Sequence, residues 1–136
     1  MTIQKITPFL WFNDQAEEAV KFYTGIFGNS RVLHLSPMVS TFELEGQKFI
    51  ALNGGPMFKF TEAVSFLVSS ETQEEIDRFW EILSEGGVRS QCGWLKDKFG
   101  LSWQIVPAAL EKLMSGPDPV RSQRVMNALM QMGKIE

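Results

Sequence analysis

An internal repeat is the feature of this sequence that most constrains its fold. A shift of 57 positions places Phe9-Leu10 on Phe66-Leu67 and Glu17-Glu18 on Glu74-Glu75. Amphipathic segments resemble one another by chance, but the order of the predicted elements around these pairs repeats as well, which favours a duplication. Each half is predicted to form a strand, a helix and three further strands. Two such βαβββ modules, each with one open sheet face, would bury those faces jointly around a cleft.

The first module, about residues 1–55, follows from the spacing of its apolar residues. Its strands are expected at residues 6–12, 31–35, 39–44 and 48–52. Asp14 followed by Glu17 has the capping-box pattern that starts a helix, and Gly28 would end that helix. Asn53-Gly54-Gly55 would either approach a ligand with bare backbone or form the turn between the modules.

The second module, about residues 61–107, repeats this order and is followed by a helical tail at 108–136. Its strands are expected at residues 64–68 and 88–91 and in a hairpin at 92–107. Thr72 and Glu75 repeat the capping box, and Gly86-Gly87 would end the helix. Two helical pieces are expected in the tail, at residues 108–114 and 119–132. The chain is therefore predicted to be a single domain of two modules and a tail.

The hairpin of residues 92–107 is the stretch that most strongly indicates a site. Its second strand alternates an apolar set with a face that carries one amide, Gln104. A polar group on an inward strand face needs a protein partner or a ligand. Gln104 would therefore either orient a ligand or simply bond to backbone in a packed barrel. Asp97, between Lys96 and Lys98, is interpreted as a hairpin-turn residue in preference to a residue at the mouth of a cleft.

Composition excludes several classes of function. A length of 136 residues fits one domain. The net charge of −3, without a basic stripe, argues against nucleic-acid binding. One cysteine excludes an internal disulfide and suits a reducing compartment. No signal-peptide pattern is present, and no apolar run approaches the ~18 residues of a membrane span. A soluble, cytoplasmic protein without a membrane partner is expected.

Two sequence motifs resemble a known family. They are P-F-L-W-F-N-D-Q-A-E-E-A-V-K-F-Y, beginning at Pro8, and C-G-W-L-K-D-K-F-G-L-S-W-Q-I-V-P, beginning at Cys92. Both are similar to the PhnB-like branch of the glyoxalase/bleomycin-resistance/dioxygenase (vicinal oxygen chelate) superfamily, whose members are often labelled 3-demethylubiquinone 3-methyltransferase. The resemblance implies an α+β fold of paired βαβββ modules that form a cupped, incomplete barrel, followed by C-terminal helices. It also implies a homodimer.

The resemblance also indicates where a metal would be held in related proteins. The implied ligand positions are Thr7, a residue near Ile50, Val64 (or its neighbour Ala63) and Gln104. Only Gln104 is a donor of a type found in such sites, whereas a divalent metal needs three or four nitrogen, oxygen or sulfur ligands. We therefore expect no metal and no other cofactor. Methyl transfer is not expected either, because Gly54-Gly55-Pro56 opens no helix of the nucleotide-binding kind.

The leading hypothesis is a small-molecule-binding protein with an aromatic-lined cup around Thr7, Trp11 and Gln104. The expected pocket residues are Thr7, Phe9, Trp11, Phe49, Phe58, Phe60, Trp94 and Gln104. A core position is the alternative for the aromatic residues among them. No catalytic residue is assigned. Cys92 lacks a histidine partner and is interpreted as structural, and His34 as a strand residue that is not a general base.

Two other functions are possible for such a chain. One is a lyase, isomerase or dioxygenase-type enzyme with a non-standard metal centre. The other is a module that only dimerises. Apolar residues form a stripe in the tail that would support a homodimer or would cap its own subunit. They are Met114, Val125, Leu129, Met130 and Met132.

Overall fold

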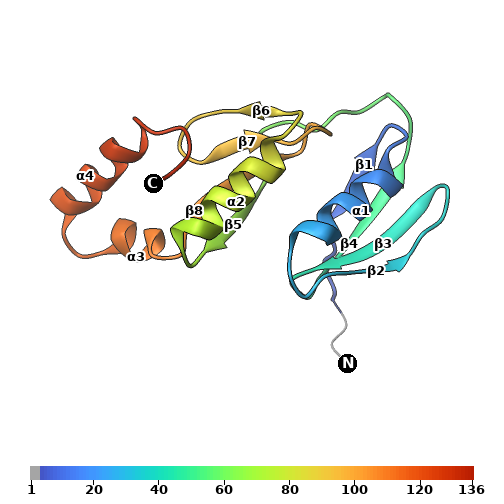
Figure 1. The fold of residues 1–136 in the computed structure, drawn as a ribbon, viewed down its shortest axis with the longest axis horizontal. Helices are drawn as coiled ribbons and strands as arrows, with labels where there is room; N and C mark the ends of the chain where they lie inside the picture. The colour runs from blue at the N-terminus through green and yellow to red at the C-terminus, as the bar shows by residue number, and fades with distance from the viewer. Residues whose placement is uncertain (1–3) are drawn as a thin grey trace. The chain divides into compact units, whose positions relative to one another are not determined.

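A computed structural model describes residues 4–136 of the chain. The chain divides into two compact units, one ending at Phe60 and the other beginning at Thr61. Each unit has a four-stranded mixed sheet, and Figure 1 shows α1 lying along the first sheet and α2 along the second. The fold is therefore α+β, with the βαβββ order repeated as predicted.

The first unit contains β1 (Phe9–Phe12), α1 (Ala16–Ile26), β2 (Arg31–His34), β3 (Val39–Leu44) and β4 (Gln47–Asn53). Its strand order is β1-β4-β3-β2, with β1 parallel to β4 and the other pairs antiparallel. The second unit contains β5 (Ser65–Ser70), α2 (Gln73–Ser84), β6 (Val88–Arg89), β7 (Trp94–Lys96), β8 (Ser102–Pro107), α3 (Leu110–Ser115) and α4 (Pro119–Leu129). Its strand order is β5-β8-β7-β6, with β5 parallel to β8.

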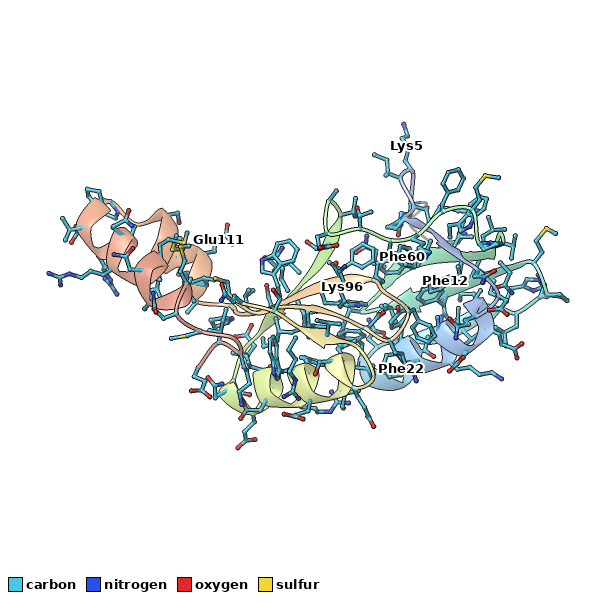
Figure 2. The ribbon with its side chains drawn as sticks, turned by 90° about the horizontal axis from the view of Figure 1, so that it is seen from above. Lys5, Phe12, Phe22, Phe60, Lys96 and Glu111 are labelled. Carbon is cyan, nitrogen blue, oxygen red and sulfur yellow. The ribbon has the colours of Figure 1, made fainter. Side chains whose placement is uncertain are left out.

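The core of the first unit lies between α1 and one face of its sheet. Tyr23 of α1 stacks on Phe42 of β3 with 6.3 Å between ring centroids, and Phe42 stacks on Phe49 at 5.4 Å. Phe12 belongs to the same core and meets Phe60 edge-on at 5.2 Å (Figure 2). Aromatic pairs in this geometry contribute beyond the area that they bury. The other face of this sheet is not covered by α1.

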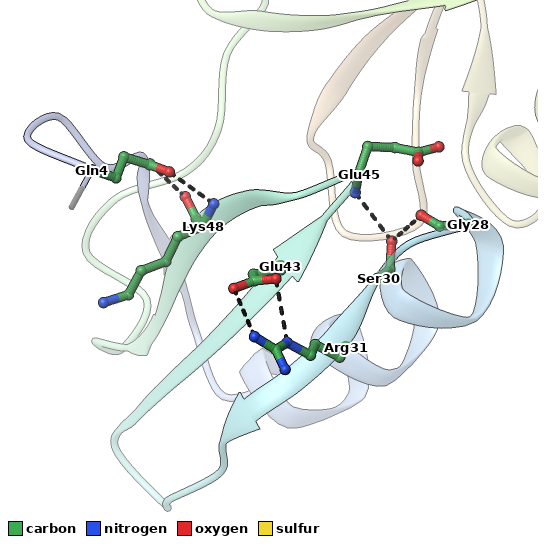
Figure 3. A network of polar contacts seen from close by, with 7 residues as sticks. All are labelled: Gln4, Gly28, Ser30, Arg31, Glu43, Glu45 and Lys48. Carbon is green, nitrogen blue, oxygen red and sulfur yellow. Dashed lines mark hydrogen bonds and ion pairs between the residues drawn. The ribbon is translucent and has the colours of Figure 1, made fainter. Parts of the chain in front are cut away.

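Side-chain contacts connect neighbouring segments of the first unit, as Figure 3 shows. The Gln4 side chain bonds to the backbone of Lys48 twice, at 2.9 Å to its carbonyl and at 3.0 Å from its N–H. Arg31 of β2 pairs with Glu43 of β3 at 3.3 Å. Exposed ion pairs of this kind stabilise a fold only weakly.

The two helix starts differ from each other. The capping box predicted for α2 is confirmed, because Thr72 Oγ1 accepts from the Glu75 N–H at 3.2 Å. The capping box predicted at Asp14 and Glu17 is wrong, since no side chain caps α1 at its N-cap residue. Instead, Asn53 at the end of β4 accepts from the Ala16 N–H at 2.8 Å. A residue distant in sequence therefore supplies the partner that the helix N-terminus needs.

The 57-residue repeat holds in the helices but not in the strands that precede them. Tyr23 and Trp80, one repeat apart, are both buried, whereas Leu10 is 7% exposed and its equivalent Leu67 is 56% exposed. The connection from β1 to α1 spans residues 13–15, but that from β5 to α2 spans only residues 71–72. The strand is thereby displaced by one residue. A shift of one residue moves every side chain of a strand to the opposite face. A residue of β5 therefore faces the opposite side from the residue of β1 that lies 57 positions before it.

Several predicted elements extend beyond the observed ones. β1 starts at Phe9, and Ile6 outside it is 83% exposed. β6 ends at Arg89, because the chain then turns and Cys92 adopts a left-handed φ of 58°. α4 ends at Leu129 because the chain beyond it returns to the second sheet.

The C-terminal residues are held by the second unit. Lys134 pairs with Asp77 of α2 at 2.9 Å, and Gln73 donates to the carbonyl of Ile135 at 3.0 Å. The hydrogen bond between Lys134 and Asp77 lowers the pKa of the Asp77 carboxyl and raises the pKa of the Lys134 ammonium. Ile135 itself is buried. Within residues 4–136, no helix is long and apolar enough to cross a membrane.

The predicted apolar stripe of the tail is only partly covered. Met130 is exposed, while Met114, Val125, Leu129 and Met132 are half-buried. The stripe therefore leaves apolar surface uncovered at Met130.

The Asn53-Gly54-Gly55 segment packs tightly under Trp11, so we expect Gly54→Ala to destabilise the first unit. A Cβ atom at Gly54 would lie 2.4 Å from the Trp11 indole. Overpacking of this kind costs about 1–3 kcal/mol of unfolding free energy. Gly25→Ala is the control, because a Cβ there meets nothing within 4 Å. It should stabilise α1 by about 0.5–1 kcal/mol. Urea denaturation measures both, and equal effects of the two substitutions would contradict the packing.

Candidate functional site

A buried carboxylate organises the β7–β8 hairpin. Asp97 is 2% exposed. Its Oδ1 accepts from the N–H groups of Phe99 at 2.9 Å and Leu101 at 3.1 Å, and its Oδ2 accepts from Trp103 Nε1 at 2.9 Å. The first two bonds close the turn, and the third fixes the indole ring in the core. The turn role predicted for Asp97 is confirmed.

Alternation along β8 then separates a core face from an open face. Trp103 and Ile105 are buried on the face that α2 covers. Ser102 and Gln104 lie on the other face, because successive strand residues point to opposite sides. Strand register places Ser102 between Ser65 of β5 and Lys96 of β7.

Gln104 finds a partner within its own sheet. Its Nε2 donates to Ser65 Oγ at 2.9 Å. The residue is half-buried, and register places it opposite Trp94 on the open face. The partner of Gln104 is therefore a side chain on the neighbouring strand. The backbone bond that was the alternative to ligand binding is not the bond that Gln104 makes.

A hollow of about 530 Å³ lies on the open face of the second unit. This volume falls within the range of small-molecule sites. Apolar side chains and neutral polar ones contribute to its walls together with one pair of opposite charges. Its lining residues are Glu62, Val88, Ser90, Gln91, Cys92, Trp94, Leu95, Lys96 and Ser102.

The charges at this hollow compensate each other. Lys96 Nζ lies 2.8 Å from Glu62 Oε1. The hydrogen bond from Lys96 holds the pKa of the Glu62 carboxyl below its ordinary value, which favours the ionised form of this carboxyl. Lys96, labelled in Figure 2, projects from β7. Since these two are the only formally charged side chains in the lining, the hollow carries no net charge.

Cys92 joins the hollow to the tail. Its Sγ donates to the carbonyl of Leu129 at 3.2 Å, and its backbone N–H donates to Met132 at 2.8 Å. This geometry agrees with a structural role. His34 is exposed on β2.

The aromatic residues of the predicted pocket have different surroundings. Trp94 lines the hollow. In the first unit, Phe9 and Trp11 lie on the open face of β1, opposite Ile50 and Leu52 of β4. Trp11 donates from Nε1 to the carbonyl of Gly55 at 2.9 Å.

Phe58 and Thr7 lie near these residues, whereas two other predicted pocket residues do not face the open side. Phe58 meets Trp11 edge-on at 4.9 Å, and Thr7 is half-buried just before β1. Phe49 is 6% exposed in the core under α1, which corrects its assignment to a pocket, since it is one residue out of phase with Ile50. Phe60 packs against Phe12 of that core.

Sequence reasoning missed several residues of the hollow, chiefly Ser102, Lys96 and Glu62. Ser102 could have been predicted from the sequence, because strand alternation places it on the same face as Gln104. The Glu62–Lys96 pair was not, because no periodicity connects a loop residue to β7.

The positions implied for metal ligands do not fit a resident metal. Ile50 and Val64 have no donor atoms in their side chains, Thr7 offers only a hydroxyl, and Gln104 offers a single amide oxygen. Over the part of the chain that the structure describes, no three His, Cys, Asp or Glu side chains are grouped to hold an ion. The donor set is therefore too small for the three or four ligands that a divalent metal needs.

A family model described as 3-demethylubiquinone-9 3-methyltransferase matches residues 4–106. A PhnB protein from Bacillus cereus, described provisionally as a 3-demethylubiquinone-9 3-methyltransferase, is 36% identical over 77% of this chain and 100% of its own, with a TM-score of 0.74. No curated protein matches the sequence.

More distant structures show the fold alone. The fosfomycin resistance protein FosX from Listeria monocytogenes is 18% identical over 82% of this chain and 98% of its own, with a TM-score of 0.60. A glyoxalase/bleomycin resistance protein from Albidiferax ferrireducens is 16% identical over 76% of this chain and 98% of its own, with a TM-score of 0.55.

We expect Asp97→Asn to destabilise the second unit by about 2–4 kcal/mol, because an amide nitrogen cannot accept from the buried Trp103 Nε1–H. Asp118→Asn is the matched control. Asp118 also accepts from two backbone N–H groups, at the start of α4, but asparagine caps helices as well as aspartate does. Urea denaturation followed by tryptophan fluorescence measures both. A loss at Asp97 no larger than that at Asp118 would contradict the role of the carboxylate.

Proposed function

The chain belongs to the 3-demethylubiquinone-9 3-methyltransferase (PhnB-like) family of the glyoxalase/bleomycin-resistance superfamily, and we propose that it is a small-molecule-binding protein. The hollow of the second unit is the proposed site. The observation that supports it best is the buried Ser102 hydroxyl, which has no hydrogen-bond partner among the described residues and borders this hollow. Small-molecule sites combine such isolated polar groups with apolar walls.

The first unit contributes its own proposed ligand contacts. Phe9 is 56% exposed on the open face of β1, and Trp11 lies beside it on the same face. Their exposure supports the proposal that they belong to the first-unit part of the aromatic cup expected from the sequence. Their proposed role is separate from that of the hollow, and substitutions in each unit test it independently.

We propose that binding needs neither a metal nor another cofactor and that methyl transfer is not the activity. The donor set described above supports the first part. The second is supported by the two strand-to-helix connections, residues 13–15 and 71–72, because neither contains a glycine. A nucleotide-type cofactor site requires a glycine-rich loop at that place. No residue is assigned a catalytic role.

A homodimer is also part of the proposal. Its support is the apolar surface that Met126 of α4 and Met130, just after this helix, expose. An exposed apolar surface of this kind commonly marks a protein interface.

Binding in the hollow is tested by filling it. We expect uncharged aromatic fragments to shift the amide resonances of residues 88–104 in ¹⁵N NMR spectra. Val88→Trp, which adds a bulky side chain at the lining, should weaken that binding at least about tenfold. Val120→Trp is the matched control, since Val88 is 61% exposed and Val120 is 59% exposed on α4. If no fragment shifts these resonances, or if both variants bind equally, the proposed site is wrong.

The metal-free part is tested by calorimetric titration of zinc, nickel and manganese into the full chain. We expect no stoichiometric binding, because the implied positions offer too few donors. Stoichiometric binding with a sub-micromolar dissociation constant would contradict this part and would favour the enzyme alternative.

A further inference from the structure

Two buried hydroxyls have no hydrogen-bond partner within residues 4–136, those of Ser70 and Ser102. An unpaired buried hydroxyl is costly, so each instance calls for a reason. Ser102 is fully buried and borders the hollow, whereas Ser70, at the end of β5, does not line it. Strand alternation places Ser70 on the face that α2 covers and Ser102 on the open face. Only Ser102 therefore lies at the wall of the hollow. Because Ser102 has no exposed surface, a ligand in the hollow reaches its hydroxyl only when a neighbouring lining side chain moves aside.

The position of Ser102 is fixed on both sides. It is flanked in register by Ser65 and Lys96. Ser65 Oγ accepts from Gln104, and Lys96 pairs with Glu62. Both neighbours are thus engaged with other residues, and neither bonds to Ser102. The Asp97 turn next to Lys96 keeps this part of the hairpin in place.

The charge of the lining limits what the hollow can hold. Its one cation and its one anion are 2.8 Å apart and satisfy each other. A charged ligand would have to separate this pair or lose its water without gaining a counter-ion, and both are unfavourable. An uncharged molecule meets no such penalty.

We propose that Ser102 determines the specificity of the hollow and that its ligand is an uncharged, largely apolar molecule carrying a hydroxyl or carbonyl oxygen. The apolar part contacts Val88 and Trp94, and the oxygen hydrogen-bonds to Ser102 Oγ. A serine hydroxyl both donates and accepts, so either type of oxygen satisfies it. This inference rests on the proposed function, because it concerns the same hollow.

The experiment compares three probes of one shape: 2-naphthol, naphthalene and 2-naphthoate. Calorimetry or ¹⁵N NMR gives the dissociation constant of each for the wild-type chain, Ser102→Ala and Ser70→Ala. Ser102→Ala should weaken 2-naphthol binding about 3- to 10-fold, the effect of one hydrogen bond, and leave naphthalene unchanged. Ser70→Ala should change neither. 2-Naphthoate should bind the wild-type chain on the order of tenfold more weakly than 2-naphthol. Ser102→Cys, which keeps a weaker donor, should give an intermediate constant.

The outcomes separate this inference from the proposed function. Equal binding of 2-naphthol to the wild-type chain and Ser102→Ala would overturn the inference, and so would tighter binding of 2-naphthoate. If 2-naphthol binding is still lost in Val88→Trp, the hollow remains the site and the proposed function stands. If neither the naphthalenes nor other aromatic fragments bind in the hollow, both proposals are wrong.

Discussion

The candidate site depends on the three hydrogen bonds that the buried Asp97 carboxylate accepts. Two of them close the β7–β8 turn, and the third holds the Trp103 indole under α2. With Trp103 fixed on the core face, Ser102 and Gln104 must point to the open face. A slip of one residue would exchange the two faces. The carboxylate therefore links the stability of the unit to the chemistry that its open face presents.

Most elements could be predicted from the sequence, because helical spacing and strand alternation depend only on neighbouring residues. The β3 boundaries and the capping box at Thr72 are examples. Features that depend on residues distant in sequence could not be predicted. The cap on α1 comes from Asn53, and the face of β5 depends on a connection one residue shorter than its counterpart.

The site was predicted in part, for the same physical reason. The open face of β8 was identified through Gln104, and Trp94 does line the hollow. Phe49 was misassigned, because successive strand residues face opposite sides and Ile50, not Phe49, lies opposite Phe9 on the open face. The Glu62–Lys96 pair, which sets the charge of the hollow, arises from a contact between a loop and a strand. No sequence pattern could have indicated it.

The central claim is that the hollow holds an uncharged molecule through Ser102, and a crystal structure of the protein with 2-naphthol tests it most directly. The account predicts the naphthol oxygen about 2.8 Å from Ser102 Oγ, the ring against Trp94 and Val88, and the Glu62–Lys96 pair intact. A naphthol bound outside the hollow, or bound within it with its oxygen turned away from Ser102, would contradict the account.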